Sequence, residues 1–171
     1  MNAIVKHEPR TAVRAGLKPP CDVDHIEDTF SRLRLVLSKI RMAPSVAEVR
    51  ELVASDGFQD AKREIAIALT QATEPQIRAT LATLVGAYPN ASKSDLTAFG
   101  ALLVMDVRAM RPTVFAISRA VTNLRRTSKF LPSIAEVIEA VKDAQDYLAN
   151  IEGMASECPQ LVIENLERGL R

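Results

Sequence analysis

The chain has 171 residues, of which 47% are hydrophobic and 25% charged, a composition typical of one soluble globular domain and not of a disordered chain. Its 22 Lys and Arg and 21 Asp and Glu leave a net charge of +1, which excludes a globally basic nucleic-acid binder. Five Phe, two Tyr, six Gly and no Trp disfavour both a β-sandwich and an aromatic platform for single-stranded nucleic acid.

The first half of the chain contains an arm and four predicted helices. Residues 1–22 hold three prolines and four basic residues, and we expect them to form a flexible, mildly basic arm. From residue 23 to 171 the hydrophobic residues follow helical spacing, which predicts one helical domain. The first helix is expected to begin at Asp24 as its N-cap, with one apolar face made of Ile26, Phe30, Leu33, Leu37 and Ile40. The next three are predicted from Ser45 to the Asp56-Gly57 turn, over about 61–72, and after Thr73 with Pro75 in the first turn.

The second half of the chain continues the same pattern. Tyr88-Pro89-Asn90 interrupts it, and helices are predicted to begin near Ser94, after Pro112, at Ser133 and, as a last short element, after Pro159. The alternating pattern of a strand does not occur in the sequence. We therefore predict an all-α, single-domain helical bundle of about seven or eight helices with a flexible N-terminal arm.

Cysteine and histidine are too few and too scattered for metal or nucleophilic chemistry. Cys21 and Cys158 lie near opposite ends of the chain, and His7 and His25 are the two histidines. A zinc site requires about four closely spaced nitrogen or sulfur ligands, and a catalytic triad requires a suitably placed histidine. We expect two reduced thiols, no metal, no catalytic residue and a cytoplasmic protein, because the sequence also lacks a signal peptide and a run of about 18 apolar residues.

Residues 86–94 partly match a Walker A loop. Ala87 and Ser92 stand where that motif requires glycine, and Pro89 lacks the N–H group that a phosphate cradle would use. We therefore expect no nucleotide and no other cofactor.

One hexapeptide occurs twice. Pro44-Ser45-Val46-Ala47-Glu48-Val49 is nearly identical to Pro132-Ser133-Ile134-Ala135-Glu136-Val137, and each follows a helix with a basic end. Ser-x-x-Glu predicts a capping box, in which each side chain bonds to the backbone N–H of the other residue. Two well-formed helix starts explain the pair, and a short duplication of a helix–turn–helix unit is the alternative.

Charge is unevenly distributed along the chain. Residues 107–135 contain no acid and six basic residues, whereas residues 136–167 contain eight acids and only Lys142 as a base. Three interpretations follow: the two regions face each other within the bundle, the basic one contacts DNA, or either region contacts a protein partner. The tentative binding residues are Arg108, Arg111, Arg119, Arg125, Arg126 and Lys129.

Residues 84–141 resemble a known family. Tyr88-Pro89 is followed by two predicted helices and then by Lys129-Phe130-Leu131-Pro132-Ser133-Ile134-Ala135-Glu136-Val137. This order resembles the phage replicative-helicase loader and inhibitor family and its prophage relatives. Two departures are Phe99 near a place where the family often has Trp, and a helical pattern over 146–171 where the family has a disordered tail.

The resemblance implies a non-enzymatic adaptor of phage or prophage origin that binds a replicative helicase, and an initiator is a further candidate partner. Whether it would load or inhibit the helicase is left open. Six motif residues are expected to form turns and caps and not the partner interface: Tyr88, Pro89, Phe130, Pro132, Ser133 and Glu136.

Two other functions follow from the residues alone. A DNA-binding regulator would use the basic turns for phosphate contacts, chiefly Arg119, Arg125, Arg126 and Lys129. An uncharacterised protein-interaction module would use the same unbalanced surface for another partner. An enzyme built from scattered carboxylates would require two buried Asp or Glu within about 6 Å of each other.

Overall fold

The part of the chain that the structure describes folds into seven α-helices. The computed structural model describes residues 21–88 and 93–170, with side chains in the second range from residue 96 onward. Within these ranges the chain forms no β-sheet, which confirms the prediction of an all-α single-domain bundle. The predicted flexible arm lies outside the described residues as far as residue 20. The helices are α1 (Val23–Met42), α2 (Val46–Ala54), α3 (Asp56–Ala68), α4 (Glu74–Val85), α5 (Lys93–Ala109), α6 (Val114–Thr127) and α7 (Ile134–Glu167).

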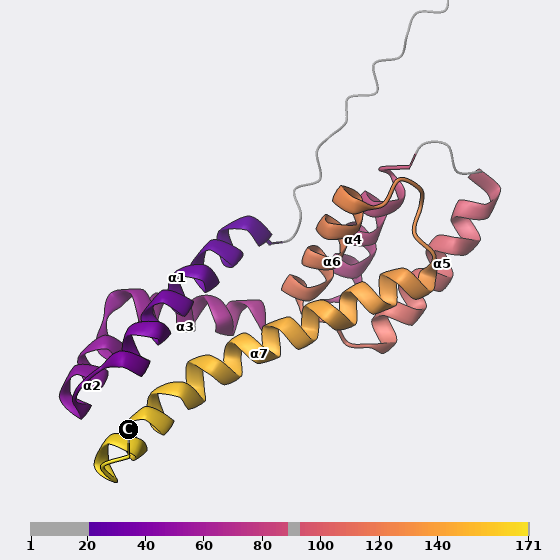
Figure 1. The fold of residues 1–171 in the computed structure, drawn as a ribbon. Coiled ribbons are helices and arrows are strands. Elements are labelled where there is room, and N and C mark those ends of the chain that lie inside the picture. Colours follow the sequence, from indigo (N-terminus) through magenta and orange to yellow (C-terminus); the bar gives the residue numbers. More distant parts are fainter. Residues whose placement is uncertain (1–20, 89–92, 171) are drawn as a thin grey trace, which may run out of the picture.

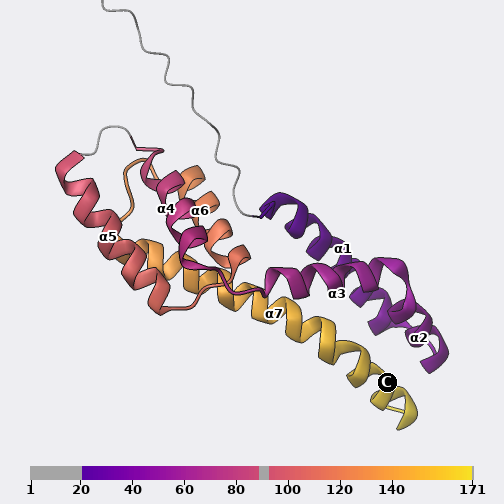
Figure 2. The same ribbon diagram turned by 180° about the vertical axis from the view of Figure 1, so that it is seen from behind.

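The long helix α7 organises the molecule. Its 34 residues correspond to a length of about 50 Å. Figures 1 and 2 show α5 and α6 beside the first half of α7, with α4 packed on α5 and α6, and α1, α2 and α3 beside its second half. The result is an elongated molecule with two groups of helices on one shared helix. No helix in the described part of the chain is long and apolar enough to cross a membrane.

Each group of helices has its own hydrophobic core. In the α1–α3 cluster, Phe30, Leu33 and Phe58 pack against Leu148 and Ile151 of α7. In the α4–α6 cluster, Val137 and Val141 from the start of α7 pack against buried residues of α4, α5 and α6. These buried residues include Ile77, Leu81, Leu84, Leu103, Val107, Ile117 and Val121. Apolar residues on one face of α7 therefore contribute to both cores, which makes α7 the main connection between them.

The two clusters meet at the beginning of α6. Phe115 belongs to α6 but is fully buried in the α1–α3 cluster, where its ring centre lies 5.5 Å from that of Phe30. Close by, the backbone N–H of Ala72 donates to the Pro112 carbonyl oxygen, and the backbone N–H of Val114 donates to the Thr70 carbonyl oxygen. These contacts fasten the α3–α4 connection to the α5–α6 connection at the middle of the molecule.

Two helix starts differ from the prediction. The N-cap of α1 is Asp22 and not Asp24, because the Asp22 carboxylate accepts from the backbone N–H of His25 at 3.1 Å. Helix α3 begins at Asp56, so the predicted Asp56-Gly57 turn is its first helical turn. The physical reason is burial, since Phe58, Ala61, Ile65 and Ala68 form one apolar stripe that starts before residue 61.

Helix α7 continues through Pro159, so the predicted break and separate last helix are wrong. A proline inside a helix cannot donate to the carbonyl four residues before it and usually weakens the helix. Here Ala155, Cys158 and Pro159 are all buried against the α1–α3 cluster. Tertiary packing on both sides of the proline keeps the backbone helical.

Both copies of the hexapeptide begin a helix, as predicted, but only one forms a complete capping box. At α7 the Glu136 carboxylate accepts from the backbone N–H of Ser133 at 2.7 Å, and Ser133 Oγ accepts from the N–H of Glu136 at 3.3 Å. At α2, Ser45 Oγ accepts from Glu48 N–H at 3.3 Å, and the reciprocal bond does not occur among the described contacts. The helices that follow have 9 and 34 residues, so the two units differ in the length of their second helix.

The complete capping box predicts a pH dependence of stability. The backbone N–H of Ser133 stabilises the Glu136 carboxylate and lowers its pKa below the ordinary value. The ionised Glu136 contributes fully to the stability of the fold above the unfolded-state pKa of about 4.3. This contribution is lost as the pH falls through the lower folded-state pKa.

Glutamine in place of Glu136 can keep the cap without titrating. We expect Glu136→Gln to reduce the loss in melting temperature between pH 7 and about pH 3, measured by circular dichroism. Glu139→Gln is the control, and an equal change in both variants would contradict the assignment.

Candidate functional site

The turn between α6 and α7 contains the motif on which the family resemblance rests. Helix α6 ends at Thr127 with Ser128 as its C-cap, and α7 begins after Ser133. The backbone N–H of Ser128 donates to the Leu124 carbonyl at 2.8 Å, closing the last turn of α6. Pro132 is buried, so both ends of the connection are fixed by backbone or packing contacts.

Tyr88 holds this turn in place from the end of α4. Its hydroxyl lies 3.3 Å from the Leu124 carbonyl oxygen and 3.2 Å from that of Ser128, and its single proton serves one or the other. The Leu124 carbonyl already accepts from the Ser128 N–H, whereas the Ser128 carbonyl lies just past the end of α6, where carbonyls lack intrahelical partners. The structural role predicted for Tyr88, Pro132, Ser133 and Glu136 is therefore supported by contacts. Pro89 lies outside the described residues.

Phe130 does not have the structural role that was predicted for it. Its side chain is 83% exposed, although the flanking Leu131 and Pro132 are partly or fully buried. The physical reason is that a short connection directs neighbouring side chains to different sides, and Leu131 and Pro132 occupy the side toward the bundle. Among the described residues the largest exposed apolar side chain of the motif therefore points away from the core.

The six predicted binding cations do not form one face. Arg108 and Arg111 precede α6, and Lys129 follows it, so the length of α6, about 20 Å, separates them. Arg108 pairs with Glu74 of α4 at 2.6 Å, and Arg126 pairs with Asp24 of α1 at 3.1 Å. Arg111 adopts a positive φ of 48° in the α5–α6 turn. Arg125, in the last turn of α6, and Lys129, next to Phe130 in the chain, are exposed and have no ion pair within the described residues.

The Arg119 side chain contacts two neighbouring helices of the fold. Its Nε lies 2.7 Å from Oε1 of Glu27 on α1, and its guanidinium carbon lies 4.1 Å from the ring centre of Tyr147 on α7. Arg34 of α1 reaches the same ring at 5.5 Å. Cation–π and ion-pair contacts therefore join α1, α6 and α7 at this point. No sequence pattern singles out Tyr147, because its position next to two arginines depends on packing between distant helices.

The basic region and the acidic region meet where α6 packs against α7. The ion pairs from α6 go to Glu27 and Asp24 of α1, and none of those described joins α6 to an acid of α7. The acids of α7 at positions 136, 139, 143 and 146 are exposed and lie on one helix face, because they are spaced by three and four residues. Within the described part of the chain, the two regions therefore lie side by side in the bundle, as one interpretation predicted, but their opposite charges do not form ion pairs with each other.

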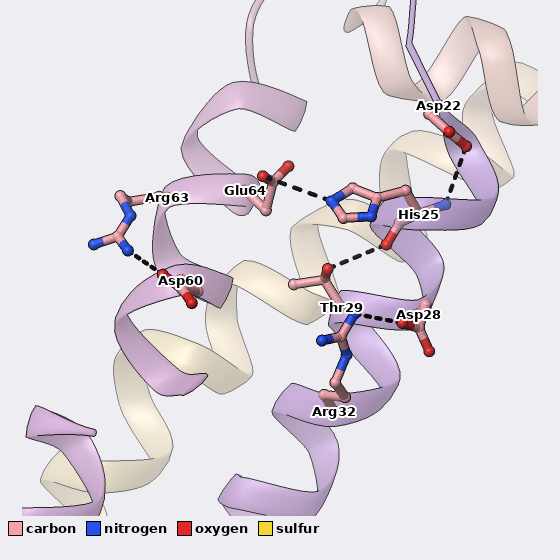
Figure 3. A network of polar contacts seen from close by, with 8 residues as sticks. All are labelled: Asp22, His25, Asp28, Thr29, Arg32, Asp60, Arg63 and Glu64. Carbon is pink, nitrogen blue, oxygen red and sulfur yellow. Dashed lines mark hydrogen bonds and ion pairs between the residues drawn. The ribbon is translucent and has the colours of Figure 1, made fainter. Parts of the chain in front are cut away.

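A second group of polar side chains lines a hollow of about 220 Å³ between α1 and α3. Figure 3 shows His25 of α1 directed toward Glu64 of α3, with Nε2 4.0 Å from Oε1. Arg32 pairs with Asp28, and Arg63 with Asp60, each within its own helix. Exposed ion pairs of this kind contribute little to stability, and the charged groups in them already have a partner within the protein. The His25 side chain is 57% exposed, so it lies at the surface.

The interior of the described residues holds little polar chemistry. The buried polar side chains are Thr29, Thr80 and Ser118, so this part of the chain has no buried carboxylate pair of the kind that the enzyme hypothesis requires. No group of three metal-ligating side chains occurs among the described residues. Cys21 and Cys158 are both free thiols, and burial raises the pKa of the Cys21 thiol, which lowers its reactivity.

Comparison with protein-family models, with curated proteins and with solved structures gives no match to this chain. The resemblance of residues 84–141 to the helicase loader and inhibitor family therefore stays a prediction from the motif residues.

Proposed function

We propose that this protein is a non-enzymatic adaptor that binds a protein partner through the α6–α7 turn. The observation that carries the proposal is the 83% exposure of Phe130 in a turn that Tyr88, Pro132 and the Ser133 cap hold in place. An exposed aromatic ring on a rigid connection can fill a pocket on a partner without loss of order in the turn.

The neighbouring charges indicate the character of the partner surface. Arg125 and Lys129 are exposed and lack ion pairs among the described residues, so a partner pocket with an acidic rim would complement both. From the motif resemblance, we propose a replicative helicase as that partner, in a phage or prophage replication setting in the cytoplasm. An initiator protein is a further candidate.

Binding to the cognate replicative helicase tests the proposal. We expect a complex at micromolar concentration and low salt in size-exclusion chromatography and isothermal titration calorimetry. Phe130→Ala should raise the Kd at least about tenfold, equal to about 1.4 kcal/mol, because the ring supplies the central apolar contact. Leu35→Ala is the control, since Leu35 is also apolar and 66% exposed but lies on α1. No complex, or equal weakening by both variants, would contradict the proposal.

A DNA-binding regulator is the second candidate, and the free cations Arg125 and Lys129 favour it. Two phosphate contacts would give a slope of about −2 for log K against log salt on duplex DNA. Fluorescence anisotropy with duplex DNA at several salt concentrations separates the two functions. Binding that has this slope and survives Phe130→Ala would support DNA and count against the adaptor.

A further inference from the structure

A second hollow lies at the other end of the molecule, between α2, α3 and the second half of α7. It has a volume of about 460 Å³. Its apolar lining comes from Val53 and Ala54 of α2, Phe58 of α3, and Ala155, Pro159 and Ile163 of α7. The three residues from α7 are spaced by four, so one continuous stripe of that helix forms the floor.

Two of the uncharged polar side chains that line this hollow already make hydrogen bonds within the protein. Gln59 Nε2 donates to the Val53 carbonyl at 2.7 Å, and Ser156 Oγ donates to the Glu152 carbonyl at 2.9 Å. Neither side chain needs a hydrogen bond from an occupant. The groove therefore presents an apolar surface to whatever enters it.

The rim of the groove is positively charged. Arg50 of α2 and Lys62 of α3 are exposed and line it, and no acidic side chain does. Several other arginines on the described surface pair with acids, among them Arg63, which is next to Lys62 in the chain. Arg50 and Lys62 have no such partner among the described residues, so the charges on this rim are available to a ligand.

We propose that this groove binds an acidic amphipathic helix of a partner protein. The apolar face of such a helix would lie on Ala155, Pro159 and Ile163, and its carboxylates would meet Arg50 and Lys62. The site is separate from the α6–α7 turn and does not depend on the function proposed for it.

Two observations select a helix from another protein. The groove is walled by three helices and offers no open strand edge, so an occupant must satisfy its own backbone hydrogen bonds, as a helix does. The chain's own residues 1–20 have the wrong charge for this rim, because they contain Lys6, Arg10, Arg14 and Lys18 but only Glu8 as an acid.

Methyl-resolved NMR with designed peptides tests the proposal on the full chain. The probe is a peptide of about 18 residues with Leu at positions i, i+4 and i+7 and Glu on the remaining face, and the matched peptide carries Lys in place of Glu. We expect the acidic peptide to shift the methyl resonances of Val53, Ala54 and Ile163 at or below millimolar concentration. The basic peptide should not shift them.

Charge reversal provides the decisive comparison. The double variant Arg50→Glu, Lys62→Glu should bind the acidic peptide with an affinity at least about tenfold lower, and it should bind the basic peptide. Lys39→Glu with Lys142→Glu changes the net charge equally but lies outside the groove, so it should leave both affinities unchanged. Circular dichroism checks that all variants stay helical.

Three results would overturn the proposal. The first is the absence of shifts at these methyl groups with millimolar acidic peptide. The second is equal weakening by the groove pair and the control pair, which would indicate a general charge effect. The third is a dimer in size-exclusion chromatography that covers the same methyl groups, which would assign the groove to a second copy of this chain.

Discussion

Replacing Phe115 with alanine is expected to lower the free energy of unfolding by about 3–5 kcal/mol. The ring is fully buried, lies 5.5 Å from Phe30 in an edge-to-face arrangement, and stacks 6.4 Å from Tyr147. Alanine would leave a cavity where α1, α6 and α7 meet, and the surrounding helices could not fill it without moving both clusters. Urea denaturation followed by circular dichroism measures the change.

Phe130→Ala is the matched control for this prediction, because it removes the same side chain from an exposed position. We expect it to change the free energy of unfolding by no more than about 0.5 kcal/mol. Since Phe115 links the two clusters, the Phe115→Ala variant should also separate their unfolding, seen as a broader transition with a lower denaturant dependence. A loss below about 1 kcal/mol with an unchanged slope would mean that Phe115 does not join the clusters.

Replacing Arg119 with alanine is expected to lower the free energy of unfolding by about 2 kcal/mol. The substitution removes the 2.7 Å ion pair with Glu27 and the contact with the Tyr147 ring, and it leaves the half-exposed Glu27 without its partner. Arg119→Lys should recover only part of the loss, because lysine keeps the charge but not the planar group that stacks on tyrosine.

Arg125→Ala is the control for Arg119, since Arg125 is one of the six predicted binding cations but is exposed and unpaired among the described residues. In thermal and urea unfolding, the free energy of unfolding of Arg125→Ala should stay within about 0.5 kcal/mol of the value for the natural protein. A double-mutant cycle of Arg119→Ala with Tyr147→Leu measures the coupling of the two side chains directly. Equal changes in the free energy of unfolding for Arg119→Ala and Arg125→Ala would contradict the structural role of Arg119.

The fold was largely predictable because its signals are local. Ser45, Thr73 and Ser133 each precede a helix at the expected position, and the apolar residues of each helix repeat within a few turns. Pro159 shows the limit of such reasoning. Its local effect is to break a helix, but burial against α2 and α3, which are about a hundred residues earlier, outweighs that effect.

The candidate sites were less predictable because they depend on which distant residues meet. Arg126 and Asp24 are separated by 102 residues, and no local pattern distinguishes this pair from one with an acid of α7. The exposure of Phe130 depends on how Leu131 and Pro132 settle against the bundle. The groove of Arg50 and Lys62 requires three helices to enclose it, so its residues look like ordinary amphipathic positions in the sequence.

The continuity of α7 has a consequence for partners with two contact points. Ser133, next to the Phe130 turn, and Pro159, in the floor of the groove, lie on one helix about 40 Å apart. A helix of this kind resists bending, so the spacing between the two proposed contacts is set in advance. An assembly that presents a pocket and an acidic helix at that spacing would bind with an enhanced effective concentration for the second contact, and one with a different spacing would gain nothing from it.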